Sequence, residues 1–324
     1  MKNKTTIDLG YCISQAIKDY GVSIDPHLSL LLANPLWMGL NTSDSKGYLP
    51  IERGYVSFIH PLALEQFSVN ANCLFIPVRG NSAQQYDMVL QRLKNKKNVL
   101  VKLSDAVLFE EEGSSDVLKP IYSILDNVAP EETDQGEITL RFSQDQTRRI
   151  SKKEFLSYWK EKESQRINAE WFVMIPSKTK MTDELLQNKL ASAFVKQARN
   201  LEPSYDKLHT GHAVIEFLKQ SLNHPNAEYY DPASHYKLWR DSMERGNCLC
   251  SCRTQYAKAL LEIQPMWNTS LSHLIDMLYL SAADWSRFYR RLTPNPTERE
   301  LHCWYKLLLE SEKSLLNAFN NLVD

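Results

Sequence analysis

The stretch "TIDLGYCISQAIKDYGVS" places Cys12 near the start of an expected helix, where a thiol could do chemistry. A thiol in the first turn of a helix lies near the positive end of the helix dipole and near unpaired backbone N–H groups, which favour the thiolate. The same N–H groups can stabilise the oxyanion that forms when a thiolate attacks a carbonyl. Cysteine is also among the most buried residue types and packs as a small apolar side chain. The sequence therefore leaves two interpretations of Cys12 open, a nucleophile and a packed core residue.

A cysteine nucleophile usually needs a histidine base, which a carboxylate or an amide orients in turn. The strand expected to carry such a base, "KPIYSILDNV" (119–128), contains no histidine. Of the eight histidines, only His27 and His60 belong to the same half of the chain as Cys12. The missing histidine weakens the catalytic interpretation.

Two other motifs contain metal-ligating residue types. "GNCLCSCR" places Cys248, Cys250 and Cys252 at alternate positions, whereas structural zinc sites use pairs spaced C-x₂₋₄-C. We expect these small residues to allow close helix packing. "HTGHAV" places His209 and His212 three residues apart without a third ligand, and we expect surface or capping histidines there. These two motifs therefore predict no metal site. The sequence contains no G-x-G-x-x-G, P-loop or G-x-S-x-G motif, so nucleotide-dependent chemistry is not expected and we expect no cofactor.

The elements that must position Cys12 alternate between helix and strand in the first half. Apolar residues recur at helical spacing over 8–20, with Asp8 as the expected N-cap and Gly21 just past the end. Ser151 and Glu154 have the spacing of a capping box. We expect short basic runs at 92–98 and 146–153 to be solvated turns. Further helices are expected over 82–95 and 151–162, and strands over 98–103, 119–128, 136–143 and 169–176.

The second half of the chain has a different pattern. Amphipathic helical periodicity begins at about residue 182 and continues to the C-terminus, interrupted at "LEPS", "NHPNAEYYDP" and "TPNPTERE", with no competing strand signal. The boundary is expected in "IPSKTKM" (175–181). We therefore predict an α+β domain over residues 1–180 and an all-helical domain over residues 181–324.

Composition excludes several classes of protein. The formal net charge of −1 over 324 residues gives no broad positive field for nucleic acid. No run of about 18 apolar residues predicts a membrane span, and the N-terminus does not have the pattern of a signal peptide. Six cysteines without a dense framework favour reduced thiols in the cytoplasm. The sequence leaves a homo-oligomer open.

The order of these elements resembles a known family. "YCISQAIKDYG" is followed by "VLVKLSDAVLFEE" and "ISKKEFLSYW", and later by "MERGNCLCSCRTQYAKALLE" and "SAADWSRFYRRL". Together these segments resemble the butirosin biosynthesis protein H family, whose N-terminal domain is related to papain-like, bacteriocin-processing cysteine peptidases. The resemblance implies a papain-like N-terminal domain followed by a helical domain.

The resemblance also implies an activity in bacterial natural-product biosynthesis. An acyl group would pass from an acyl carrier protein thioester to Cys12, and then to a small amine acceptor as an amide, without ATP. Lys119 stands where the family has its histidine, and the acidic position falls on Ser143 or Asp145. The site implied is thus Cys12, Lys119 and Asp145.

The departure from the family pattern leaves further alternatives. Lys119 could serve as the base, or His60, His27 or His212 could replace it. The chain could equally be an inactive member that binds a biosynthetic partner as a scaffold. A peptidase is less expected, because Thr6 stands where such peptidases place a glutamine, six residues before the cysteine.

Overall fold

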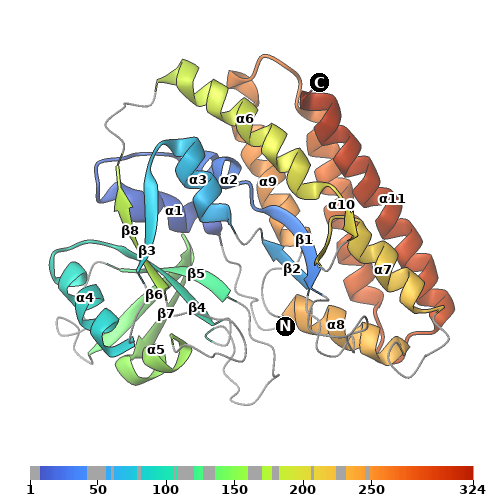
Figure 1. The fold of residues 1–324 in the computed structure, drawn as a ribbon, viewed down its shortest axis with the longest axis horizontal. Coiled ribbons are helices and arrows are strands. Elements are labelled where there is room, and N and C mark those ends of the chain that lie inside the picture. The colour runs from blue at the N-terminus through green and yellow to red at the C-terminus, as the bar shows by residue number, and fades with distance from the viewer. Residues whose placement is uncertain are drawn as a thin grey trace. The chain divides into compact units, whose positions relative to one another are not determined.

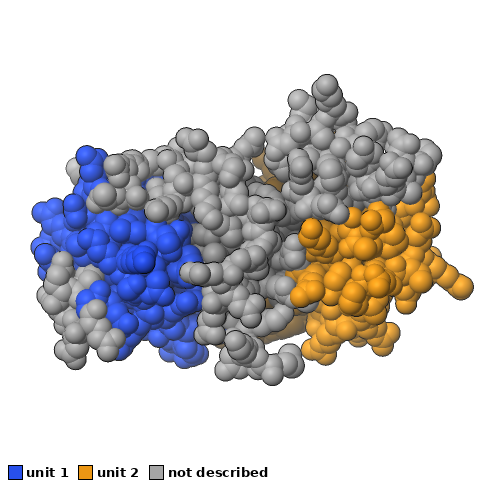
Figure 2. Space-filling view, turned by 90° about the horizontal axis from the view of Figure 1, so that it is seen from below, with its two compact units in different colours: residues 1–33, 64–181 blue, residues 34–63, 182–324 orange. Residues whose placement is uncertain are grey.

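The computed structural model describes residues 8–41, 56–59, 62–78, 82–104, 107, 120–126, 136–159, 170–176, 182–205, 208–223, 231–244 and 249–323. The chain divides into two compact units (Figure 1, Figure 2). Unit 1 comprises residues 1–33 and 64–181, and unit 2 comprises residues 34–63 and 182–324. The division differs from two continuous domains, because residues 34–63 group with the C-terminal half.

Unit 1 is built on a six-stranded sheet in which every pairing is antiparallel. The strand order is β3 (Leu74–Val78), β8 (Glu170–Ile175), β4 (Val99–Ser104), β5 (Pro120–Leu125), β6 (Glu137–Ser143) and β7 (Gln146–Ser151). Its helices are α1 (Leu9–Lys18), α2 (Pro26–Ala33), α3 (Ala63–Ala71), α4 (Ser82–Lys94) and α5 (Lys152–Tyr158).

Different helices pack on the two faces of this sheet. Leu125 and Leu140 are opposite each other on β5 and β6, and both belong to the core that includes Phe155 of α5. Ile124 and Arg141 form the neighbouring pair and therefore point to the other face, because side chains alternate along a strand. Helix α1 packs on that second face, against β4, β5 and β6.

Local signals correctly predicted several elements of unit 1. Asp8 caps α1 by accepting a hydrogen bond from the Tyr11 N–H at 2.9 Å, and Gly21 adopts a φ of +77° just beyond the helix. Ser151 and Glu154 form the expected capping box at the start of α5. Helix α4 and strands β4, β5, β6 and β8 also lie within one residue of the expected starts.

The expectation of a solvated turn over 146–153 is wrong. Residues Gln146–Ser151 form strand β7, which pairs with β6 in a hairpin. Ile150 is buried opposite Ile138, and the Arg148 guanidinium donates to the Val107 carbonyl oxygen. The hairpin partner and this contact hold a basic segment in the sheet.

Of the helices in the described ranges, α6 to α11 belong to unit 2. Helix α11 (Glu298–Val323) runs alongside α10 (Ser272–Arg291) and also packs against α6 (Asp183–Leu201) (Figure 1). The helices of unit 2 are α6 (Asp183–Leu201), α7 (Ala213–Ser221), α8 (Pro232–Glu244), α9 (Leu249–Ile263), α10 (Ser272–Arg291) and α11 (Glu298–Val323), with a 3₁₀ turn, η6 (Gln264–Met266).

Unit 2 also contains strands, so the expectation of an all-helical C-terminal half is wrong. A four-stranded antiparallel sheet has the order β2 (Val56–Ile59), β1 (Leu36–Asn41), β10 (Leu208–Thr210) and β9 (Ser204–Tyr205). β9 and β10 are too short to give a periodic signal, and β10 pairs with a strand from far earlier in the chain. This pairing explains why residues 34–63 belong to unit 2.

The core of unit 2 joins β1 to the helices. Met38 and Leu40 of β1 are buried in one cluster with Trp239, Trp285 and Tyr305. The fold class is therefore mixed α+β with antiparallel sheets and C-terminal helices, as expected at that level. None of the helices in the described ranges has the combined length and apolarity needed to cross a lipid bilayer.

Candidate functional site

Cys12 is the fourth residue of α1 and is completely buried where that helix meets the sheet. Its Sγ lies 3.7 Å from the carbonyl oxygen of Phe142 and 3.8 Å from that of Arg141, both on β6. A protonated thiol is a weak donor, and carbonyl oxygens are acceptors, so this environment suits the neutral form.

The electrostatic environment of Cys12 opposes a thiolate. Burial raises the pKa of the Cys12 thiol, and the nearby Asp8 carboxylate raises it further. The N–H of Tyr11 is already bound to the Asp8 side chain and the N–H of Cys12 to the Asp8 carbonyl oxygen, at 2.9 and 3.0 Å. The direction is opposite to the one expected for a cysteine at a helix N-terminus, because desolvation outweighs the dipole.

The expected partners of Cys12 are dispersed or not described. Lys119 and His60 lie outside the described residues. Asp145 is exposed in the turn between β6 and β7, and Ser143 is half-buried at the end of β6. His27 is half-exposed, with its Nδ1 3.6 Å from Asp25 Oδ1. Exposed Asp145 and fully buried Cys12 therefore lie in contrasting environments.

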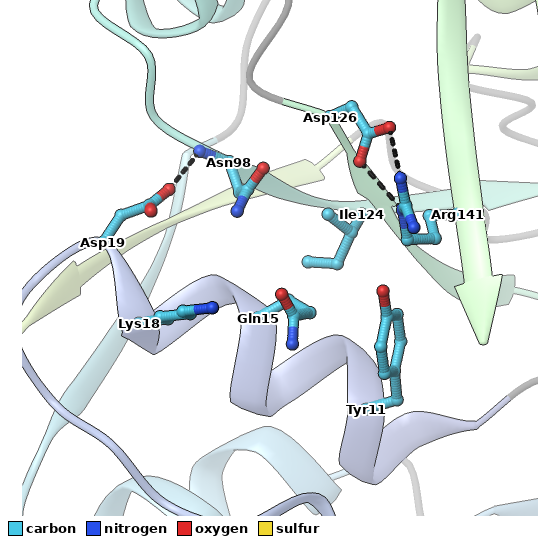
Figure 3. A pocket seen from close by; sticks show the side chains of 8 residues that line it. All are labelled: Tyr11, Gln15, Lys18, Asp19, Asn98, Ile124, Asp126 and Arg141. Atoms are coloured by element: carbon cyan, nitrogen blue, oxygen red, sulfur yellow. Dashed lines mark hydrogen bonds and ion pairs between the residues drawn. The ribbon is translucent and has the colours of Figure 1, made fainter. Parts of the chain in front are cut away.

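A polar pocket of about 370 Å³ opens beside α1 in unit 1 (Figure 3). Tyr11, Gln15 and Lys18 are spaced four and three residues apart, so they share one face of α1, next to the face that buries Cys12. The full lining is Tyr11, Gln15, Lys18, Asp19, Asn98, Ile124, Asp126 and Arg141.

One side of the pocket is a fixed ion pair. Arg141 Nε lies 2.9 Å from Asp126 Oδ1, and its second terminal nitrogen lies 2.8 Å from Oδ2, so the guanidinium binds the carboxylate in a two-point geometry. These hydrogen bonds raise the pKa of Arg141, which stays cationic. Burial raises the pKa of Tyr11, whose hydroxyl points toward this pair, and the guanidinium partly opposes that rise (Figure 3).

The other side of the pocket lies at the C-terminal end of α1. Asp19 Oδ2 accepts a hydrogen bond from the Asn98 backbone N–H, and Lys97 Nζ donates to the Asp19 carbonyl oxygen. The side chains of Lys18, Gln15 and Asn98 point into the pocket (Figure 3). Within the described part of the chain, these three side chains have no hydrogen-bond partner, which leaves their polar atoms available to a ligand.

Sequence reasoning did not identify this pocket. Its residues come from α1 and its C-cap residue, from the segment before β4, from β5 and the residue that follows it, and from β6. The stripe of Tyr11, Gln15 and Lys18 is visible in the sequence, but a polar stripe on an amphipathic helix is also typical of a solvated face. Only the sheet that packs against α1 shows that this stripe lines a pocket and is not simply a solvated face.

The histidine and cysteine motifs of unit 2 do not gather into a site. His209 stacks on Phe217 with ring centroids 4.3 Å apart, and His212 is the N-cap residue of α7 but makes no side-chain capping hydrogen bond. Cys250 and Cys252 are half-buried on α9, and Cys248 lies outside the described residues. Among the residues that the structure describes, no group of three potential metal ligands comes together.

Comparison with known proteins adds no family to this description. No family model matches the sequence, and no curated protein matches it. The resemblance to the butirosin biosynthesis protein H family therefore stays a prediction from the sequence.

Proposed function

We propose that this chain binds a small polar molecule in the pocket beside α1 and does not use Cys12 as a nucleophile. One contrast carries the proposal: Cys12 is fully buried with a raised pKa, while the adjacent face of the same helix lines an open pocket. A thiolate nucleophile must be both ionised and accessible. The pocket instead offers polar groups that can bind a ligand without covalent chemistry.

This proposal corresponds to the non-catalytic alternative within the butirosin biosynthesis protein H resemblance. Under this resemblance, Lys119 occupies the position of the family's catalytic histidine. Without that histidine, Cys12 can persist as a core residue. The pocket would then hold the molecule that the protein senses or presents to a biosynthetic partner. A reducing, cytoplasmic location is part of the proposal.

A second candidate is the cysteine-dependent acyltransferase. The observation in its favour is that α1 carries Cys12 close to its N-terminal end and packs on the antiparallel strands β5 and β6. In a papain-like enzyme the cysteine likewise lies on a helix, and the base comes from a later strand. In this function an uncovered Cys12 thiol would attack the thioester of an acyl carrier protein and release the carrier thiol. A small amine would then attack the Cys12 thioester, which forms the amide and returns the Cys12 thiol.

Thiol chemistry distinguishes the two candidates. We expect Cys12 in the folded protein to react with iodoacetamide at least about tenfold more slowly than exposed Cys303, because its sulfur is desolvated and protonated. In urea the two rates should converge. Peptide mapping by mass spectrometry after timed quenching measures each cysteine separately.

A thioester mimic provides the complementary test. Wild-type protein and Cys12→Ala are incubated with an acyl thioester and analysed by intact mass. The proposed binding function predicts the same acyl mass shifts, relative to each unmodified protein, for the wild type and for Cys12→Ala. An acyl adduct that forms on the wild type and is absent from Cys12→Ala would favour the acyltransferase instead.

A further inference from the structure

The polar pocket beside α1 has a composition that restricts its ligand. Its lining carries two cations, Lys18 and Arg141, and two carboxylates, Asp19 and Asp126, so the formal charges cancel. Among the lining residues, Ile124 alone is aliphatic. A hydrocarbon chain would therefore find little apolar surface, and a ligand of large net charge would find no excess of opposite charge.

A phosphate-bearing ligand is disfavoured by two further features. Arg141 already donates to both oxygens of Asp126, so its two-point geometry is in use. The helix end at the pocket is the C-terminal end of α1, where Lys18 and Asp19 lie. The dipole at a helix C-terminus is negative, so it opposes a doubly charged phosphate and favours a ligand that also carries a cationic group.

Lys18 and Asp19 are the charged groups that remain available. The Lys18 ammonium has no hydrogen-bond partner within the described ranges, and the second oxygen of Asp19 has none there either. These two residues line the same pocket, so a compact molecule with both charges could contact both of them. The amides of Gln15 and Asn98 each supply a donor and an acceptor beside them (Figure 3).

We infer that the pocket binds a small zwitterion of the free amino acid class, with its carboxylate at Lys18 and its ammonium at Asp19. This inference rests on the proposed binding function and specifies its ligand. The cavity of about 370 Å³ fits this size class, because ligand pockets span about 300 to 1,000 Å³ and this one is at the small end.

Matched probes test the inference on the full chain. L-alanine carries both charges, propionate lacks the ammonium and ethylamine lacks the carboxylate; L-glutamine is a larger zwitterion. Binding is measured by titration calorimetry and by ligand-observed NMR. We expect the better zwitterion to bind at least about tenfold more tightly than propionate or ethylamine, because each single-charge probe leaves one protein charge unmatched.

Variants assign the two charges. Lys18→Gln and Asp19→Asn should each remove the preference for the zwitterion, while the exposed control substitutions Lys153→Gln and Asp87→Asn should leave it intact. Circular dichroism and thermal unfolding establish that each variant is folded. Retention of the preference in both pocket variants would place zwitterion binding elsewhere and overturn the assignment.

Two further outcomes of the binding measurements would contradict the inference. If propionate or ethylamine binds as tightly as the zwitterions, or if none of the four probes binds, the zwitterion inference is wrong. The proposed absence of Cys12 catalysis has its own readout in the thioester experiment. Failure of the ligand class and failure of the proposed function are therefore distinguishable.

Discussion

His235 is a buried polar residue of unit 2 that directional hydrogen bonds hold in place. Its Nδ1 lies 2.7 Å from the Tyr305 hydroxyl and its Nε2 3.2 Å from Ser221 Oγ. The Trp239 N–H donates to the Tyr305 oxygen, and the Ser221 hydroxyl donates to the Leu218 carbonyl oxygen. Because the Ser221 proton is already used, Nε2–H donates to Ser221. Burial lowers the pKa of His235 and keeps the imidazole neutral, so Nδ1 accepts the Tyr305 hydroxyl proton.

The His235 network predicts a loss of stability in acid. Burial lowers the pKa of His235 from 6.5 to about 4. Between these pH values the unfolded state binds more protons than the folded state, so the free energy of unfolding falls as the pH falls through this window. This lowering of the pKa corresponds to about 3 kcal/mol of unfolding free energy, most of which is lost between pH 7 and pH 4.

Urea unfolding at pH 7 and at pH 4, followed by tryptophan fluorescence, measures this effect. His235→Gln removes the titrating group, so its loss of stability over the same interval should be smaller than that of the wild type by about 3 kcal/mol. Parallel pH profiles for the two proteins would show that other groups cause the acid sensitivity.

At the scale of elements, the contact between α1 and α2 fixes the helix that carries both Cys12 and the pocket face. Gly10 lies in α1 where the backbone of α2 approaches closely. A Cβ at this position would lie 2.2 Å from the Pro26 carbonyl oxygen and 2.9 Å from the Leu30 Cβ. Glycine is therefore required by packing, although it is a poor helix former.

The substitution Gly10→Ala has two opposing effects on stability, a gain in helix propensity and a steric clash with α2. Propensity alone would stabilise the helix by up to about 1 kcal/mol. The overlap with a backbone oxygen forces α1 and α2 apart, and overpacking of this kind typically costs about 1–3 kcal/mol. We expect a net loss of unfolding free energy in urea. The exposed α4 substitution Gln91→Ala serves as the control and should be near neutral; a Gly10→Ala protein as stable as the wild type would contradict the packing argument.

At the scale of the whole molecule, unit 2 is assembled from two separate parts of the sequence. Strand β1 pairs with β10 and buries Met38 and Leu40 in the core of the C-terminal helices. The Gln197 amide of α6 donates to the Leu36 carbonyl oxygen at 2.7 Å and accepts from the Leu36 N–H at 3.2 Å. The C-terminal residues therefore need the earlier segment to complete their core.

A fragment of residues 182–324 tests this dependence. Without β1 and β2, the surface around Trp239 and Trp285 is exposed, so we expect the fragment to bind the dye ANS and to lose a cooperative thermal transition. Adding residues 34–63, fused or as a separate chain, should restore the transition and suppress dye binding. A cooperative, dye-free fragment would show that β1 is dispensable.

Local sequence signals were sufficient for the elements that depend on neighbouring residues. The Asp8 cap and the spacing of Leu9, Ile13 and Ile17 predict α1, and the Ser151–Glu154 capping box predicts the start of α5. Strands β4 and β6 followed from apolar runs and from alternation. These signals operate over a few residues, so no distant partner is needed to recognise them.

Tertiary structure decided the features that depend on distant partners. β10 is a strand because β1 lies beside it, and the pocket exists because β5 and β6 lie beneath α1. The ionisation of Cys12 is the sharpest example. The sequence placed it near a helix N-terminus, where a solvated thiol is acidified, but packing against β6 buries the sulfur and raises its pKa. Desolvation depends on what covers a residue, which local sequence does not specify.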